Sequence, residues 1–248
     1  MMATSRKRLR CMAENKTKKT TLGVVLAGGK GNRFTGDTPK PFRKLCEKPV
    51  FIHSVLAMEQ SEKIDGIAVV VPAGYEETVK ATLARFGVQK TVAVVCGGAE
   101  RQDSVKAALD VGLKGRFDRV LLHDAARPLL SCDVIERLCD ALENHRAATA
   151  ALPVTDTVAM TENGKTIAVV PDRSTLWQVQ TPQGFCLYTL AEAYARLAPE
   201  ILAACTDDCG VIRAFLPEEA VALVKGDRKL LKLTYPEDLA VLTALAGD

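Results

Sequence analysis

The sequence lacks any apolar run near the roughly 18 residues that a membrane-spanning helix needs. We therefore exclude an integral membrane protein. It also lacks the composition of a collagen-like or disordered chain, because 48% of its residues are hydrophobic and 25% are charged. A length of 248 residues suggests one large domain or two small ones, with enough chain to bury a substantial core.

The eight cysteines form no C-x-x-C pair, and no histidine lies near enough in the sequence to suggest a zinc site. The first 20 residues contain no apolar stretch, so they are not a secretory signal. A disulfide framework is not expected in a chain without such a signal. We expect free thiols and a cytoplasmic protein.

Excess basic charge is confined to the start of the chain. Residues 1–20 carry +6, so the remainder carries −3 although the whole chain carries +3. A nucleic-acid-binding body would show its basic residues on one face of the fold, which argues against nucleic acid as a partner. We expect a basic, disordered leader over 1–20 and a single domain over 21–248; a tether to RNA or to a membrane is the alternative for the leader.

From residue 21 apolar strands alternate with helical patterns. Strands are expected at 21–27, 66–71, 91–95, 119–122 and 149–154. Helices are expected at 51–60, 75–86, 103–113 and 133–144, the last with Asp133 as its N-cap. Such alternation predicts an α/β fold with a doubly wound, mostly parallel sheet. Further helices are expected at 187–198, at 207–215 and after Thr234, with strands at 220–224 and 230–233.

Residues 155–180 interrupt this alternation. Two short β-prone pieces flank the turn signal Glu162-Asn163-Gly164, which predicts a β-arm inserted in the domain. A small arm cannot bury its own apolar face. We therefore expect the arm to pack on a second subunit in a homodimer.

Three polar loops follow the first, third and fourth strands, at 28–40, 97–104 and 123–128. Ligands bind at the carboxyl ends of the strands in such sheets. The first loop fits neither the G-x-G-x-x-G dinucleotide pattern nor the G-x-x-x-x-G-K-[ST] phosphate loop. Its glycines still allow backbone N–H groups to approach a polyphosphate, and Arg33 and Lys40 can neutralise charge on a phosphorus under attack. The alternative is a surface loop with solvated charges.

The other two loops add polar side chains. Ser104 offers a hydroxyl near a base edge, although a plain strand-to-helix turn capped by Asp103 would look the same. Asp124 suits a Mg²⁺ ion, directly or through water, and Arg127 suits a phosphate; a salt-bridged turn is the alternative. We interpret His123 as a packed histidine at a strand end and not as a catalytic base.

Taken in order, these loops resemble the 2-C-methyl-D-erythritol 4-phosphate cytidylyltransferases of the non-mevalonate isoprenoid pathway. The resemblance runs from about residue 21 to the end. It is carried by the glycine loop with Arg33 and Lys40, Gly97-Gly98 to Val105, HDAARP at 123–128, Asp156-Thr157, Asp172-Arg173 to Trp177, Gln180-Thr181-Pro182, Thr206-Asp207-Asp208 and Lys232 to Leu239.

The resemblance implies a Rossmann-like nucleotidyltransferase fold whose β-arm interlocks in a homodimer. It implies that CMP is transferred from CTP to the sugar phosphate with a divalent cation, Mg²⁺. It also implies residue roles: CTP would be held by Ala27, Gly28, Gly29, Gly31, Gly98 and Ser104. Arg33 and Lys40 would stabilise the transition state, and Lys232 would act with them. Asp124 would bind the metal. The sugar phosphate would be bound by Asp124, Arg127, Thr157, Arg173, Thr181 and Thr206.

Several positions depart from the family pattern. The Gly28-Gly29 pair and Leu26 are departures that the fold should tolerate, and two others affect the site. Ala99 stands where an acidic residue is frequent, and Leu230 stands where a polar residue is frequent. We expect the side-chain contact at Ala99 to be absent, and Asp227 is a candidate to compensate for Leu230.

The reaction itself needs little acid–base chemistry. Its nucleophile is a phosphate oxygen that is largely ionised at neutral pH. Competing interpretations are a cytidylyltransferase for another polyol phosphate such as ribitol 5-phosphate, a nicotinamide dehydrogenase, and a nucleotide-binding scaffold without activity.

Overall fold

The computed structural model describes residues 18–28 and 39–247. Predictions that concern Gly29, Gly31, Arg33 and the leader before residue 18 lie outside the described residues. Within them, no helix is long and apolar enough to cross a membrane.

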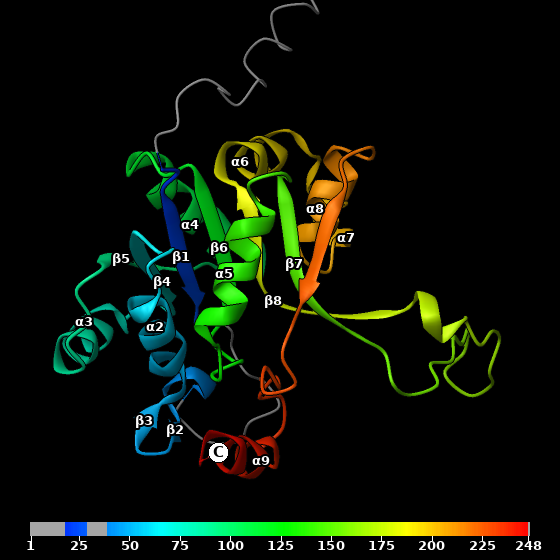
Figure 1. Cartoon of the computed structure of the whole chain (residues 1–248), viewed down its shortest axis with the longest axis horizontal. Helices are drawn as coiled ribbons and strands as arrows, with labels where there is room; N and C mark the ends of the chain where they lie inside the picture. Colours follow the sequence, from blue (N-terminus) through cyan, green and yellow to red (C-terminus); the bar gives the residue numbers. More distant parts are fainter. Residues whose placement is uncertain (1–17, 29–38, 248) are drawn as a thin grey trace, which may run out of the picture.

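Seven strands of the described chain form one sheet in the order β5-β4-β1-β6-β8-β7-β9. Their bounds are Thr21–Leu26 (β1), Gly66–Val71 (β4), Thr91–Cys96 (β5), Arg119–Asp124 (β6), Ala147–Pro153 (β7), Trp177–Cys186 (β8) and Val221–Lys225 (β9). The sheet is mostly parallel, as predicted, because β1 pairs in parallel with β4 and β6, β4 with β5, and β7 with β9. Figure 1 shows the strands side by side with the helices around them.

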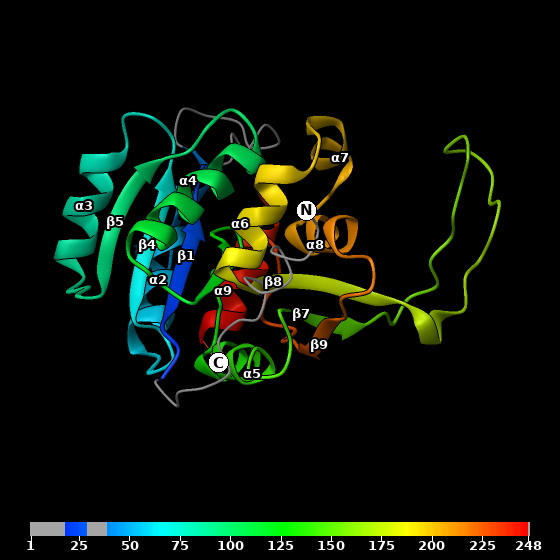
Figure 2. The same ribbon diagram turned by 90° about the horizontal axis from the view of Figure 1, so that it is seen from above.

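Helices cover both faces of the sheet, as the predicted doubly wound arrangement requires (Figure 2). One face carries α2 (Val50–Gln60), α3 (Glu76–Arg85) and α5 (Cys132–Ala141); the other carries α4 (Arg101–Lys114), α6 (Leu187–Arg196), α7 (Pro199–Ala204) and α8 (Asp208–Phe215). The central strands are therefore apolar on both sides. All six residues of β4, from Gly66 to Val71, are buried. This explains why an uninterrupted apolar run identified this strand in the sequence.

The strand β8 was not predicted. It lies between β6 and β7 and is antiparallel to both. Its sequence WQVQTPQGFC contains three glutamines, a proline and a glycine, so hydrophobicity gives no strand signal. Gln180 and Gln183 are nevertheless buried. The side-chain amide of Gln180 donates to the backbone oxygen of Asp227, and that of Gln183 donates to the carboxylate of Asp207.

Other expectations need smaller corrections. Residues 230–233 form no strand, and α7 was not predicted. Asp133 is not the N-cap of α5, because the helix begins at Cys132 after Ser131. Asp103 does not cap α4 from outside the helix. It lies in the first turn and accepts a hydrogen bond from the backbone N–H of Glu100, the N-cap residue.

The segment between β7 and β8 projects away from the sheet (Figure 1). It contains the short helix η2 (Arg173–Thr175) and a single β-bridge between Met160 and Val169. The two expected β-prone pieces thus meet at one bridge and do not form a regular hairpin. Most of the arm's side chains, including Val158 and Ile167, are exposed in this chain.

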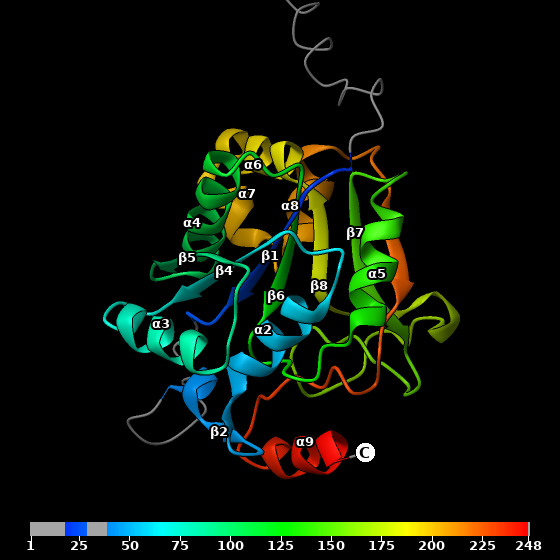
Figure 3. The same cartoon turned by 60° about the vertical axis from the view of Figure 1, so that its left-hand side comes forward.

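The C-terminal helix α9 (Asp238–Gly247) lies beside a small hairpin made of β2 (Lys44–Leu45) and β3 (Lys48–Pro49), as Figure 3 shows. Leu45, Val50, Leu233 and Leu242 form a separate apolar cluster there. Residues 226–235, which we call the strap, run from β9 to this cluster. The helix and hairpin therefore anchor the far end of the strap beside the carboxyl edge of the sheet.

Candidate active site

The loops after β1 and β6 lie side by side at the carboxyl edge of the sheet. Leu26 is paired with Asp124 in the parallel ladder, and the backbone N–H of Ala125 donates to Leu26 O at 3.0 Å. Ala27 and Gly28, which directly follow β1, therefore lie next to Asp124. This adjacency was expected from the order of parallel strands.

The loops after β1 and β5 meet at Ser104. A Cβ atom added to Gly28 would lie 3.1 Å from Ser104 Oγ, and one added to Gly97 would lie 2.5 Å from it. A Cβ atom on Gly98 would collide with the side chain of Asp103. The backbone thus approaches Ser104 as closely as glycine permits. The structure brings together the described members of the predicted nucleotide site: Ala27, Gly28, Gly98 and Ser104.

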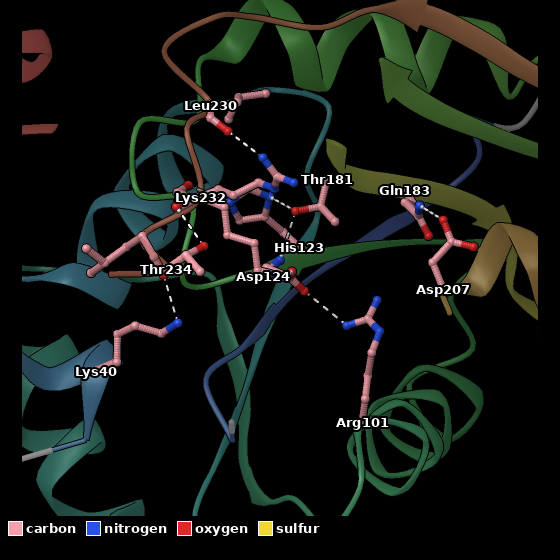
Figure 4. Close-up of polar contacts among 12 residues, drawn as sticks. Lys40, Arg101, His123, Asp124, Thr181, Gln183, Asp207, Leu230, Lys232 and Thr234 are labelled. Atoms are coloured by element: carbon pink, nitrogen blue, oxygen red, sulfur yellow. Dashed lines mark hydrogen bonds and ion pairs between the residues drawn. The ribbon is translucent and has the colours of Figure 1, made fainter. Parts of the chain in front are cut away.

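Asp124 is held between two cations (Figure 4). Its Oδ1 lies 3.0 Å from Arg101 Nη1, and its Oδ2 lies 2.7 Å from Lys232 Nζ. Burial by itself raises the pKa of this carboxyl, but Arg101 and Lys232 outweigh burial and hold the pKa well below its ordinary value. Asp124 is therefore a carboxylate throughout the physiological pH range.

The strap is tied to the site by two other cationic side chains. Lys40, in the short helix η1 (Lys40–Phe42), donates from Nζ to Leu233 O at 2.7 Å. Arg127 Nη1 donates to Leu230 O at 2.6 Å. These contacts, together with the pair of Lys232 and Asp124, explain why the strap is not a strand: its carbonyl groups are satisfied by side chains.

The departure at Leu230 has a structural reason. Its side chain is fully buried in the core on the α2 and α5 face, while its carbonyl oxygen accepts from Arg127. Asp227 pairs with β8: its backbone N–H and C=O bond to the side-chain amide of Gln180 at 3.1 and 2.8 Å. This double contact anchors the start of the strap to β8.

His123 is a packed histidine, as predicted. It is 0% exposed, and its ring nitrogens contact Arg127 O, Ser54 Oγ and Thr181 Oγ1. Burial lowers the pKa of His123 from 6.5 to about 4. Thr181 Oγ1 also accepts from the backbone N–H of Asp124 at 3.1 Å, which places Thr181 directly beside the site.

The remaining predicted residues divide into two groups. Thr206 lines a cleft of about 270 Å³ that also includes Arg101 and Asp208. Thr157 and Arg173 lie exposed on the arm, where Arg173 Nη1 donates to Thr155 O at 2.9 Å. The arm points away from the sheet, so these two residues are not brought to Asp124 of the same chain (Figure 1).

Sequence reasoning gave no role to Arg101, Asp208 or Tyr194. Arg101 Nη2 lies 2.6 Å from Asp208 Oδ2, and Tyr194 donates its hydroxyl to Asp208 Oδ1 at 2.7 Å. Arg101 and Asp208 stand in two of the sequence motifs, but no sequence pattern links two positions that lie so far apart in the chain. Burial raises the pKa of Asp208, although Arg101 and Tyr194 act in the opposite direction.

The described residues contain no group of three or more His, Cys, Asp or Glu side chains that could enclose a metal ion. Asp124 is the single predicted ligand, and both of its oxygens face cations. Mg²⁺ is commonly bound through one or two carboxylates together with substrate phosphates and water. The residues present therefore fit a magnesium ion that arrives with a nucleotide, and not one enclosed by the protein alone.

Comparisons with known proteins agree with this arrangement. The sequence model of the 2-C-methyl-D-erythritol 4-phosphate cytidylyltransferase family matches residues 21–247. The enzyme of that name from Thermobifida fusca is 40% identical over 227 residues, which cover 90% of this chain and 91% of the relative. Its counterpart from Bifidobacterium longum is 37% identical over 92% of this chain and 80% of the relative.

A solved structure gives the same result. The crystal structure of 2-C-methyl-D-erythritol 4-phosphate cytidylyltransferase from Thermus thermophilus superposes with a TM-score of 0.73 at 29% identity, over 91% of this chain and 98% of the other. The sheet order, the glycine loops around Ser104 and these matches lead to one conclusion: the chain belongs to the 2-C-methyl-D-erythritol 4-phosphate cytidylyltransferase family.

Proposed function

We propose that this chain transfers the cytidylyl group of CTP to 2-C-methyl-D-erythritol 4-phosphate and releases pyrophosphate. The observation that carries the proposal is the convergence, at one edge of the sheet, of a tight glycine cluster around Ser104 with Lys40, Asp124 and Lys232. Family membership supplies the identity of the substrates. The geometry supplies a polyphosphate-binding backbone and flexible cations next to it.

The nucleotide would bind across the loops after β1 and β5. The backbone N–H of Gly28, with those of Gly29 and Gly31 beyond the described residues, would face the triphosphate. Ala27 would lie against it without donating, because its N–H is bonded to Val70 O at 2.7 Å. Gly98 and the Ser104 hydroxyl would contact cytosine. The close approach of Gly28 and Gly97 to Ser104 supports this arrangement, because a larger side chain at either position would displace the hydroxyl.

The chemistry balances without a protein base. An oxygen of the sugar phosphate forms a bond to the α-phosphorus of CTP, and the bond between that phosphorus and the bridging oxygen of the β-phosphate breaks. The electron pair leaves with pyrophosphate. The attacking phosphate is already largely ionised at neutral pH, so it has no proton to lose. The buried position of His123 and its pKa of about 4 agree with the absence of a general base.

Catalysis then depends on position and positive charge. Lys40 and Lys232 reach the edge of the sheet from residues 192 positions apart and are linked through neighbouring strap residues. We assign charge stabilisation at the α-phosphorus to Lys40 and to Arg33, which lies outside the described residues. Lys232 would orient the incoming phosphate with the N–H groups that its contact with Asp124 leaves available.

Asp124 would hold a magnesium ion that arrives with CTP, and the ion would supply additional positive charge to the triphosphate. The sugar phosphate would be bound by Arg127, Thr181 and Thr206 of the same chain. Thr157 and Arg173 would serve the site of a second copy, because the arm carries them away from their own Asp124.

The arm therefore implies a homodimer. Large apolar side chains are exposed along the arm and the adjoining start of β8: Val158, Met160, Ile167, Val169, Val170, Trp177 and Val179. An exposed apolar group of this size is typical of a protein–protein contact. We also propose that residues 21–248 act as one domain preceded by a basic leader over 1–20, and that the enzyme is cytoplasmic, in line with the free cysteines among the described residues.

A pyrophosphate-release assay tests the function. Purified chain is given each of the four ribonucleoside triphosphates with 2-C-methyl-D-erythritol 4-phosphate or ribitol 5-phosphate, with Mg²⁺ present. We expect turnover with CTP and the methylerythritol phosphate, and formation of 4-diphosphocytidyl-2-C-methyl-D-erythritol by mass spectrometry. Preference for ribitol 5-phosphate would contradict the proposed acceptor, and the absence of pyrophosphate in all mixtures would contradict the activity.

A further inference from the structure

A row of polar groups leads from Asp124 into the interior of the protein. Arg101, in the first turn of α4, contacts Asp124 Oδ1 through Nη1 at 3.0 Å and Asp208 Oδ2 through Nη2 at 2.6 Å. Asp208, the first residue of α8, accepts on its other oxygen from the hydroxyl of Tyr194 on α6 at 2.7 Å. Three helices therefore contribute one side chain each to a continuous chain of contacts that ends at the active-site carboxylate.

Asp208 is the unexpected member of this row. It is 1% exposed, and the proposed reaction gives it no part. A buried carboxylate is costly unless it is paired, and burial of an ion pair is often no more stable than apolar packing would be. Stability alone therefore does not account for a carboxylate at this position. Its contact with Arg101 next to the site suggests a different role.

The shape of the guanidinium group explains what Asp208 can do. Arginine presents its N–H groups in a rigid planar fork, so fixing one side of the fork fixes the other. Asp208 holds Nη2 and thereby sets the direction of Nη1 toward Asp124. Asp124 then has one oxygen committed to Arg101, and the other faces Lys232 at 2.7 Å.

We propose that Tyr194, Asp208 and Arg101 form a positioning relay that fixes the carboxylate of Asp124 and, through it, the ammonium of Lys232. The inference rests on the proposed function, because it assigns Lys232 to the incoming phosphate. The three relay residues are positioning residues and do not touch the substrates.

The charges in the row support this role. Two carboxylates, Asp124 and Asp208, face two cations, Arg101 and Lys232, so the group is neutral. Arg101 is occupied by both carboxylates and is not left over as a phosphate ligand. Its removal would leave Asp124 free to turn and would remove what sets the direction of Lys232. The relay should therefore influence kcat more strongly than recognition of the cytosine base, which lies with Gly98 and Ser104.

Double-mutant cycles test the relay. We expect Asp208→Asn to lower kcat about tenfold and Arg101→Met about 100-fold, the range in which loss of an orienting partner falls. The double variant should be no slower than Arg101→Met alone, because Asp208 acts only through Arg101. Arg101→Lys should recover part of the rate, since a lysine reaches one carboxylate but does not bridge two. The KM for CTP should change less than twofold throughout.

Arg119→Met is the matched control. Arg119 lies on β6, the strand of Asp124, but at its opposite end. It is 5% exposed and pairs with Glu143 at 2.7 Å. The Arg119→Met substitution should lower the melting temperature but leave kcat of the folded protein unchanged. Additive losses for Asp208→Asn and Arg101→Met, or an equal loss of kcat in Arg119→Met, would overturn the relay. Should Asp208→Asn fail to fold, Tyr194→Phe replaces it, because it removes only a hydroxyl group.

A crystal structure of Asp208→Asn separates the relay from the proposed function, because it needs no turnover. The relay predicts that the Arg101 guanidinium rotates and that its contact with Asp124 Oδ1 is lost. An unchanged contact between Arg101 and Asp124 would overturn the relay, whatever reaction the wild-type enzyme catalyses. Lack of product with the wild-type enzyme would instead contradict the proposed function.

Discussion

The ammonium group of Lys40 lies 2.7 Å from the carbonyl oxygen of Leu233, the residue that follows Lys232. Two candidate catalytic lysines from opposite ends of the chain are thus joined through one strap residue. A carbonyl oxygen is a modest partner for a cation, and a phosphate oxygen is a stronger one. We therefore expect that CTP, when it binds, draws the Lys40 ammonium away from Leu233 O. The triphosphate would then lie next to Lys232, the residue assigned to the sugar phosphate.

Lys40→Ala should lower kcat about 10²- to 10³-fold, because it removes a donor to the phosphorus at which charge develops. Arg33→Ala should have an effect of the same size. Lys44→Ala is the control, since Lys44 is nearby and forms only a surface pair with Glu47. The melting temperatures of all three variants should stay close to that of the wild type. Near-normal turnover of either Lys40→Ala or Arg33→Ala would contradict the catalytic assignment of that residue.

Gly97→Ala should raise the KM for CTP several-fold, because the new Cβ atom would lie 2.5 Å from Ser104 Oγ and displace it. It should also destabilise the protein by about 1–3 kcal/mol, the usual cost of overpacking. Combining it with Ser104→Ala removes the obstructing hydroxyl group. We expect the double variant to regain stability in urea unfolding while its KM for CTP stays high. A normal KM for CTP in Ser104→Ala alone would show that the hydroxyl does not contact the base.

Stability should fall in mild acid because of His123. Its folded-state pKa is about 4, below the ordinary 6.5, so the unfolded chain binds the proton more readily. The contribution of neutral His123 to the free energy of unfolding is therefore complete above about pH 6.5. It is lost progressively as the pH falls toward 4, by up to about 3 kcal/mol. Urea unfolding at a series of pH values measures it.

The wild type is the reference for this experiment. His123→Gln should weaken the dependence of unfolding free energy on pH between 4 and 6.5, because glutamine takes up no proton in this range. Equal slopes for His123→Gln and the wild type would mean that His123 is not the group responsible.

The arm should complete the site of a second copy. We expect the wild type to sediment as a dimer, and Ile167→Asp, which places a charge on an exposed apolar position of the arm, to sediment as a monomer with little activity. Lys232→Ala and Arg173→Ala should each be nearly inactive alone. Mixed dimers of the two should recover activity, because one of their two sites combines an intact Lys232 with an intact Arg173. Failure of dimers proven to be mixed to recover activity would place Arg173 at its own chain's site.

Strands flanked by helices on both faces were predictable from sequence, because such strands consist of apolar residues, as the run Ile67 to Val71 does. The strand β8 was not predictable in this way. The side-chain N–H groups of its buried glutamines, Gln180 and Gln183, donate to Asp227 and Asp207, which are distant in sequence. Hydrophobicity measures transfer from water, and it carries no information about a polar partner that only the fold provides.

The strap failed as a predicted strand for the opposite reason. Its leucines are apolar, but Leu230 and Leu233 give their carbonyl oxygens to Arg127 and Lys40 and not to a neighbouring strand. Likewise, the glycine loops directly follow strands and Asp124 ends one, so both were predictable, whereas the contact of Arg101 with Asp208 depends on how α4 and α8 pack.

The structure of the enzyme crystallised with CTP tests the central claim most directly. We expect the triphosphate to lie against the backbone of Ala27 and Gly28, within hydrogen-bonding distance of Lys40 Nζ, with cytosine beside Gly98 and Ser104. A triphosphate bound elsewhere, with Lys40 still on Leu233, would contradict the account.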